Sequence, residues 1–152
     1  MRGGVFMKRA GFTLIELLIV MAIIAALMAV LIPTATGAMR RARASRLAVE
    51  IRNYVSGLQQ YLVATMPPTS LSGATESQAQ QMGFIDQNLA NKFDANLNAE
   101  PQNSRIVISL TYDARDSSIA QLVSSSLQGV FDSVTATGAT IQVTSYVQAF
   151  WW

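Results

Sequence analysis

Glu16 is the first candidate for chemistry, because it is the only charged residue between Gly11 and Pro33. The stretch between those two residues reads FTLIELLIVMAIIAALMAVLI and is otherwise almost entirely apolar. A carboxylate in such surroundings costs about 2.5–3.5 kcal/mol on membrane-insertion scales, so it normally has a partner or a function. Two interpretations stay open from these residues alone: Glu16 reaches back to the polar headgroups of a membrane, or it pairs with a cation from elsewhere.

Other catalytic chemistry is restricted by two missing residue types. The protein contains no cysteine and no histidine. Disulfides, thiol nucleophiles, the commonest general base and the usual transition-metal ligands are therefore excluded. The chain also lacks a glycine-rich nucleotide-binding loop. We therefore expect a protein that is not an enzyme.

Three aspartates provide the only cofactor hypothesis. Asp113, Asp116 and Asp132 carry the oxygen ligands that Ca²⁺ prefers. Their spacing is not that of an EF-hand loop. Asp113 and Asp116 fit equally well a turn followed by a helix cap, which is the interpretation we favour. We expect no other cofactor.

An arginine cluster follows the apolar stretch. Arg40, Arg41, Arg43 and Arg46 could contact phosphate groups of lipid headgroups or of DNA. The alternative, which we favour, is a solvated helix face or a contact between subunits. No aromatic side chain lies within the cluster for bases to stack on, so DNA binding is not indicated.

The apolar stretch itself has the length of a membrane span. A helix over residues 12–32 rises about 31 Å, which matches the thickness of the bilayer hydrocarbon. Pro33 removes a backbone donor, so a kink or local unwinding is expected over residues 29–37. The helix should then continue to about residue 64, because apolar residues recur there every three or four positions. These residues are Leu47, Ile51, Tyr54, Val55, Leu58, Tyr61 and Leu62.

The residues around Gly11 resemble a known processing signal. Lys8-Arg9-Ala10-Gly11 followed by Phe12-Thr13-Leu14-Ile15-Glu16-Leu17 is similar to the leader and cleavage site of type IV pilin precursors and type II secretion pseudopilins. The basic leader, the Gly before the cleaved bond, the Phe after it, the Glu at the fifth mature position and the Pro ending the apolar stretch all match. The resemblance is close over residues 7–62.

This resemblance implies roles for the matching residues. Prepilin peptidase would cut between Gly11 and Phe12 and N-methylate Phe12, and Glu16 would pair with the new α-ammonium of a neighbouring subunit. The chain would then divide into a leader (1–11), a membrane or filament-core helix (12–33), an amphipathic continuation (34–64) and a head (65–152). An uncleaved signal anchor is the alternative, and the leader could begin at Met1 or at Met7.

The formal charge of +2 changes once the leader is removed. Arg2, Lys8 and Arg9 lie in the leader, so cleavage leaves a net charge of −1. Five arginines then lie in residues 40–52, whereas seven of the remaining carboxylates lie in the head. An acidic head argues against nonspecific DNA binding there.

The head is expected to be a small α+β unit on the apolar stripe of the long helix. Met66-Pro67-Pro68 should end that helix. Short helices near 77–83 and 87–93 are expected within a polar connection, followed by a strand over 105–112 and a helix from 117 to about 131. A hairpin over 134–150 should turn at Gly138, giving an antiparallel sheet of about three strands. Trp151 and Trp152 either complete the core, as we favour, or contact a partner.

The sequence therefore resembles a structural subunit of a filament. Its expected partners are other pilin subunits, prepilin peptidase, an inner-membrane assembly platform and the lipid bilayer. It would first lie in the inner membrane with a cytoplasmic N-terminus and a periplasmic head, and then in a pilus or pseudopilus. A minor pilin for motility, adhesion or DNA uptake is favoured. The alternatives are a secretion pseudopilin and a pilus-tip module that binds DNA or another ligand.

Overall fold

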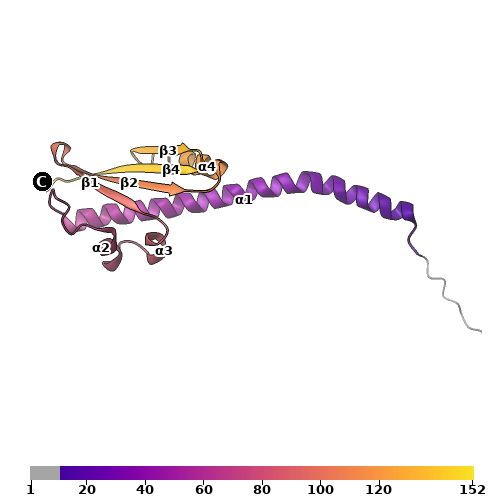
Figure 1. Ribbon diagram of the computed structural model, residues 1–152, viewed down its shortest axis with the longest axis horizontal. Helices are drawn as coiled ribbons and strands as arrows, with labels where there is room; N and C mark the ends of the chain where they lie inside the picture. Colours follow the sequence, from indigo (N-terminus) through magenta and orange to yellow (C-terminus); the bar gives the residue numbers. More distant parts are fainter. Residues whose placement is uncertain (1–10) are drawn as a thin grey trace, which may run out of the picture. The chain divides into compact units, whose positions relative to one another are not determined.

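A computed structural model describes residues 11–152 of the chain. The predicted leader up to residue 10 lies outside the described residues. The chain divides into two compact units at Ala38, with Met39–Trp152 forming the second. The first unit consists of the N-terminal part of one helix, and the second contains the rest of that helix and the head (Figure 1).

The long helix α1 runs over Leu14–Thr65, close to the predicted bounds. It ends where Met66 adopts a positive φ of 46°, directly before the two prolines. All seven residues of the predicted apolar stripe are buried, among them Ile51, Tyr54 and Leu58. The sequence pattern therefore identified the face of α1 that supports the head.

The head contains a four-stranded antiparallel sheet with the order β1-β2-β4-β3. The strands are β1 (Ala95–Glu100), β2 (Arg105–Asp113), β3 (Ser133–Thr137) and β4 (Thr140–Gln148). The central pair β2 and β4 aligns Arg105 with Gln148 at one end and Asp113 with Thr140 at the other. The α+β fold predicted from the sequence, with an antiparallel sheet on the C-terminal half of the helix, is confirmed.

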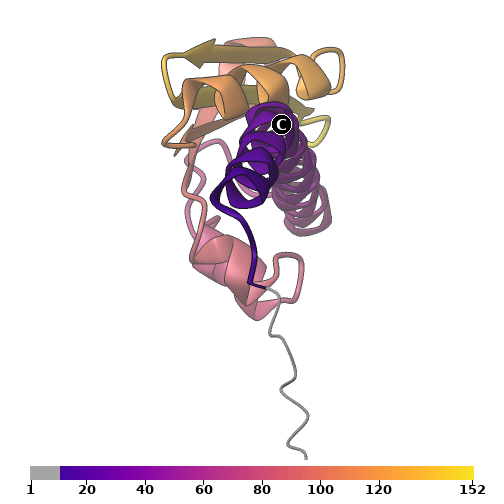
Figure 2. The ribbon, with the colours of Figure 1, turned by 90° about the vertical axis from the view of Figure 1, so that its right-hand side faces the viewer.

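The buried core lies between α1 and the sheet. Ile106, Ile108 and Leu110 of β2 and Ile141 and Val143 of β4 belong to the same buried cluster as the stripe of α1. Figure 2 shows the sheet on one side of this part of α1, with the short helices α2 (Glu76–Gln81) and α3 (Gln87–Ala90) on another side. A 3₁₀ turn, η1 (Pro101–Asn103), links β1 to β2.

The prediction missed strand β1. Its residues Ala95, Leu97 and Ala99 are half-buried and alternate with exposed Asn96 and Asn98. This alternation is typical of a strand. Asn and Ala have low strand propensity, however, so the composition of the segment predicted a loop. The strand forms because it pairs along its whole length with β2 at the edge of the sheet.

The last helix is shorter than predicted. Helix α4 covers Ser117–Leu127 instead of extending to about residue 131. Gly129 has a φ of 79°, a left-handed conformation that favours glycine and follows many helix ends. Val130 consequently lies outside the helix and is exposed.

Candidate processing and assembly site

The predicted cleavage site precedes the first turn of α1. Gly11 and Phe12 are non-helical and exposed, and 90% of the Phe12 surface is accessible. A β-carbon on Gly11 would meet no atom within 4 Å, so nothing in the described chain covers this backbone. An enzyme that needs an extended, uncovered peptide bond could therefore reach the bond between Gly11 and Phe12.

Glu16 has a partner that sequence reasoning missed. Its carboxylate accepts a hydrogen bond from the backbone N–H of Thr13 at 2.9 Å, and its own N–H donates to the Thr13 hydroxyl at 3.3 Å. These reciprocal bonds form a capping box, whose signature Thr-x-x-Glu was present in the sequence. Glu16 thus satisfies an otherwise unpaired amide at the start of α1.

The surface that follows Glu16 is apolar all round. The first unit exposes nearly every side chain from Phe12 to Ile32, including Ile15, Leu18 and Met21. Among the described residues, α1 is one helix that is long and apolar enough to cross a membrane. A helix that is apolar on every side requires lipid or other helices around it.

The helix continues through Pro33 without the predicted unwinding. Residues 29–37 are helical throughout. The Thr34 hydroxyl donates to the carbonyls of Val30 and Leu31 at 3.1 and 2.9 Å, and the Thr36 hydroxyl donates to Pro33 at 3.0 Å. The N–H that proline lacks would have bonded to the carbonyl of Ala29. The threonine hydroxyls add hydrogen bonds to other carbonyls of the adjoining turns.

The arginine cluster lies on exposed parts of the second unit. Arg40 forms an ion pair with Asp116 at 3.5 Å, and Arg46 pairs with Glu50 at 3.2 Å. Arg41 and Arg43 are exposed and have no ion pair within residues 11–152. Arg40, Arg43 and Arg46 are exposed on α1, and their contact with lipid, DNA or another subunit stays a prediction.

Each of the three aspartates proposed for calcium has a separate local role. Asp113 accepts from the N–H of Arg115 at 2.8 Å, Asp116 caps α4 by accepting from the N–H of Ser118, and Asp132 accepts from the N–H of Tyr146. Among residues 11–152, no group of three acidic side chains could hold a metal ion. Calcium binding stays a prediction, and the turn and cap account for Asp113 and Asp116.

Glu50 of α1 and Asp116 before α4 have lowered pKa values. Hydrogen bonding from the Lys92 ammonium, and then from Arg46, lowers the pKa of Glu50. The N–H of Ser118 and, more weakly, the charge of Arg40 lower the pKa of Asp116. Both groups are therefore held in the charged form at neutral pH.

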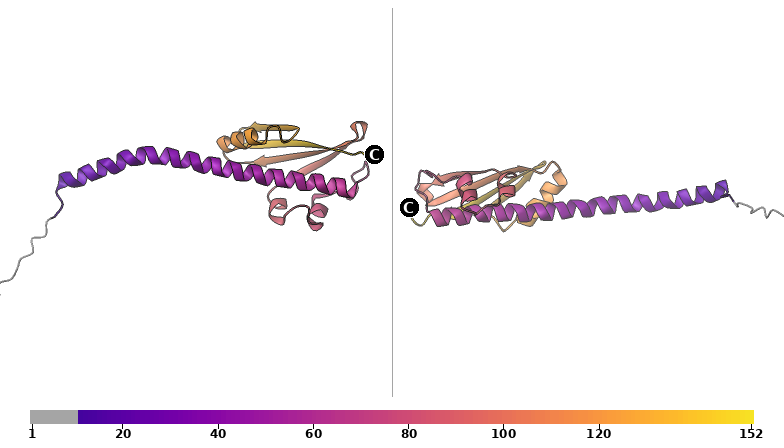
Figure 3. Two further views of the ribbon diagram at one scale, coloured as in Figure 1. Left: turned by 180° about the vertical axis from the view of Figure 1, so that it is seen from behind. Right: turned by 90° about the horizontal axis from the view of Figure 1, so that it is seen from below.

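The tryptophans lie against the end of α1. Both indole N–H groups donate to the carbonyl oxygen of Pro67 at 2.8 Å. Both rings are half-buried and pack on the core cluster, as predicted, whereas the neighbouring Phe150 is 71% exposed. Figure 3 shows the C-terminus beside the end of α1 in views from behind and from below.

Comparison with known protein families identifies the N-terminal segment. Residues 6–32 match a family model described as the prokaryotic N-terminal methylation motif, the signature of type IV pilins and pseudopilins. The match covers the predicted cleavage site, Glu16 and the apolar stretch. No curated protein and no solved structure matches the chain significantly.

Proposed function

Because the chain carries the N-terminal methylation motif of type IV pilins and pseudopilins, we propose that it is cleaved between Gly11 and Phe12 and assembled into a filament through α1. The observation that carries this proposal is the surface of α1 within the motif. It is apolar on every side and begins with one capped carboxylate. Such a helix is stable in a bilayer, and bundled with copies of itself it would form a filament core.

Glu16 is proposed to select the register of an entering subunit. Cleavage creates an α-ammonium on Phe12, and a carboxylate in an apolar core attracts such a group strongly. In the single chain Glu16 already accepts from the N–H of Thr13. The carboxylate would therefore have a hydrogen-bond partner in the membrane before assembly. The ammonium of a neighbouring subunit would then add to this hydrogen bond or replace it.

The head is proposed to lie outside the cytoplasm. Before assembly, the chain would cross the inner membrane once, with a cytoplasmic N-terminus and a periplasmic head. Basic residues at the N-terminal flank support this orientation. Extraction into the filament would require an inner-membrane assembly platform, because the chain has no nucleotide-binding loop of its own.

Within the pilin-like proteins, we assign the chain to the minor pilins, serving motility, adhesion or DNA uptake. A head without cysteine and with an additional helix, α4, supports this assignment over a major pilin. A pseudopilin of a type II secretion system is the alternative. Counting copies per filament by quantitative mass spectrometry distinguishes minor from major subunits, because a major subunit would dominate the preparation.

Intact mass of the protein from its native membrane tests the proposal most directly. We expect the mass of residues 12–152 plus one methyl group. Loss of prepilin peptidase from the same cells should restore the mass of the uncleaved chain. A mass that retains residues before Phe12 in cells with active peptidase would overturn the proposal.

A further inference from the structure

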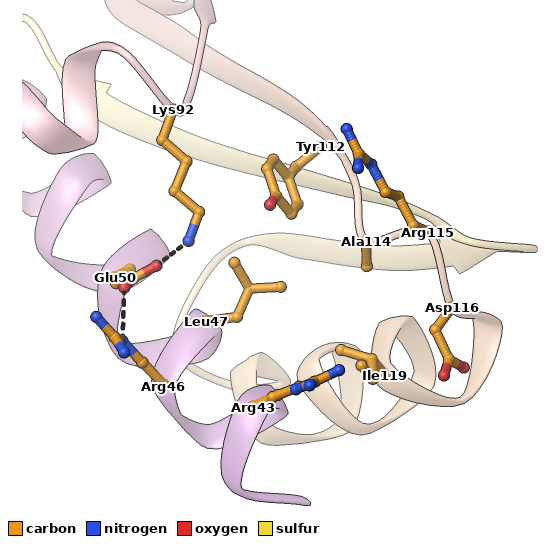
Figure 4. Close-up of a pocket in the computed structure, with 10 residues that line it drawn as sticks. All are labelled: Arg43, Arg46, Leu47, Glu50, Lys92, Tyr112, Ala114, Arg115, Asp116 and Ile119. Carbon is orange, nitrogen blue, oxygen red and sulfur yellow. Dashed lines mark hydrogen bonds and ion pairs between the residues drawn. The ribbon is translucent and has the colours of Figure 1, made fainter. Parts of the chain in front are cut away.

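A groove in the head gathers cations from three different segments. Arg43 and Arg46 come from α1, Lys92 follows α3, and Arg115 lies in the turn between β2 and α4 (Figure 4). The groove has a volume of about 590 Å³, within the range of small-ligand sites. It lies wholly within the second unit.

Two carboxylates line the same groove, and both already have partners. Glu50 bonds to Lys92 and to Arg46, as the dashed lines in Figure 4 show. Asp116 directs one oxygen to the N–H of Ser118 and the other toward Arg40, which does not line the groove. The acidic residues of the groove therefore leave two of its cations without a partner.

Those two cations are Arg43 and Arg115. Neither forms an ion pair with any carboxylate in the described part of the chain. Arg115 also adopts a φ of 59°, which is uncommon for a residue other than glycine, asparagine or aspartate. A guanidinium presents several N–H donors in a planar fork that matches the oxygens of a phosphate.

The rest of the lining is apolar or aromatic. Leu47 and Ile119 lie between the cations, and the Tyr112 ring faces the same space (Figure 4). The Lys92 ammonium lies 5.8 Å from the centre of that ring. An anion with no organic part would leave this surface uncovered, whereas a phosphate ester would contact both the cations and the apolar wall.

We propose that this groove binds a small organic phosphate, with Arg43 and Arg115 contacting the phosphate oxygens and Tyr112 contacting the organic part. Lys92 and Arg46 share the single carboxylate of Glu50, so these three groups add a net positive charge to the groove. A phospholipid headgroup and a soluble phosphate ester present the same chemistry to the groove. This site is independent of the proposed cleavage and assembly of α1.

Binding of glycerol 3-phosphate to the full chain tests the proposal. The protein is kept in an uncharged detergent, and the probe is titrated calorimetrically at low and physiological salt. We expect saturable binding that Arg43→Gln and Arg115→Gln each weaken about tenfold, since each removes a charge-assisted hydrogen bond. Glycerol without the phosphate should not bind.

Arg52→Gln is the matched control. Arg52 is an exposed arginine of the same helix but does not line the groove. Its replacement removes the same charge and should leave the affinity unchanged. Thermal unfolding of each variant, followed by circular dichroism, verifies that the head is folded. The proposal is overturned if the folded wild-type chain shows no saturable binding, or if Arg52→Gln weakens binding as much as the groove variants.

A second arm distinguishes the source of the phosphate. The chain is placed in nanodiscs of phosphatidylcholine, with or without phosphatidylglycerol, and glycerol 3-phosphate is titrated again. A lipid headgroup in the groove would compete with the probe, so the anionic discs would weaken its binding in the wild type but not in Arg43→Gln. Equal binding in both discs assigns the groove to a soluble ester. Duplex DNA that binds through Arg43 and Arg115 while glycerol 3-phosphate fails to bind would refute a small-ligand site.

Discussion

The carbonyl oxygen of Phe84 lies against Gly57, at the place that a β-carbon on Gly57 would have to occupy. The loop after α2 therefore reaches α1 through backbone contact. The side chain of Phe84 continues this contact, because its ring packs edge to face on Tyr61. Only glycine permits α1 and this loop to approach so closely.

Replacing Gly57 should consequently destabilise the head. We expect Gly57→Ala to lower the free energy of unfolding by about 1–3 kcal/mol, the usual cost of adding a methyl group to a filled site. Thermal unfolding followed by the fluorescence of the only two tryptophans, Trp151 and Trp152, measures this change. Gly37→Ala in the same helix is the control, because its β-carbon would meet nothing within 4 Å. Equal stability of the two variants would contradict the close approach.

Glu16 requires a series of variants that separates its charge from its capping role. Glu16→Gln keeps an oxygen that can accept from the N–H of Thr13, but it cannot form an ion pair with an α-ammonium. Glu16→Ala removes both interactions. If the ion pair controls assembly, both variants should insert in the membrane yet be nearly absent from sheared filaments, as measured by immunoblot. Normal incorporation of Glu16→Gln together with loss of Glu16→Ala would leave capping as the only role.

The shared acceptor at Pro67 predicts unequal effects of single and double tryptophan variants. Trp151→Phe or Trp152→Phe keeps an aromatic ring but removes one of two hydrogen bonds to the Pro67 carbonyl. Each should cost about 0.5–1.5 kcal/mol, the net value of a typical hydrogen bond. The double variant leaves that carbonyl without either donor and should cost more than either one. Urea unfolding followed by circular dichroism measures the stability of all three variants. If none of them differs from the wild type, the two hydrogen bonds to Pro67 contribute nothing measurable.

Acid should weaken the head partly through Glu50. The pKa of Glu50 is lowered in the folded state by Lys92 and Arg46, so its stabilising contribution is present above the unfolded pKa of about 4.3. That contribution is lost as the pH falls through the lower folded pKa. Between about pH 5 and pH 3, the melting temperature of Glu50→Gln should therefore fall less than that of the wild type.

Glu100 and Asp116 also have lowered pKa values, so some acid sensitivity should remain in the Glu50→Gln variant. Lys92→Gln removes the main cause of the Glu50 shift and should flatten the profile in the same way. Identical pH profiles for the wild type and Glu50→Gln would show that the pair with Lys92 contributes nothing measurable.

The sequence was most informative where one local pattern decides the structure. The period of the apolar stripe identified the buried face of α1, including Leu47 and Leu62, and the turn expected at Gly138 identified the hairpin of β3 and β4. Strand β1 was missed because pairing with β2 outweighs the poor strand propensity of its asparagines. Gly129 could have marked the end of α4, and Thr13-x-x-Glu16 could have revealed the cap.

The groove could not be predicted in this way. Lys92 and Arg115 are isolated charges in their own segments, and only the folding of the chain brings them to the groove that Arg43 also lines. Tyr112 likewise supplies the aromatic surface that the arginine cluster lacks in sequence. Sites assembled from single residues of distant segments have no local signature, whereas the N-terminal methylation motif is contiguous and can be recognised from the sequence alone.

The intact helix at Pro33 has a mechanical consequence. A helical residue advances the chain about 1.5 Å, whereas an extended residue can advance it about 3.3 Å. The turn preceding Pro33 lacks the backbone hydrogen bond from residue 33 to the carbonyl of Ala29, because proline has no N–H. Under tension this turn should open before any other in α1, lengthening each subunit without disturbing its head. A filament built from such subunits would lengthen reversibly under load, because the same few residues of every copy would extend.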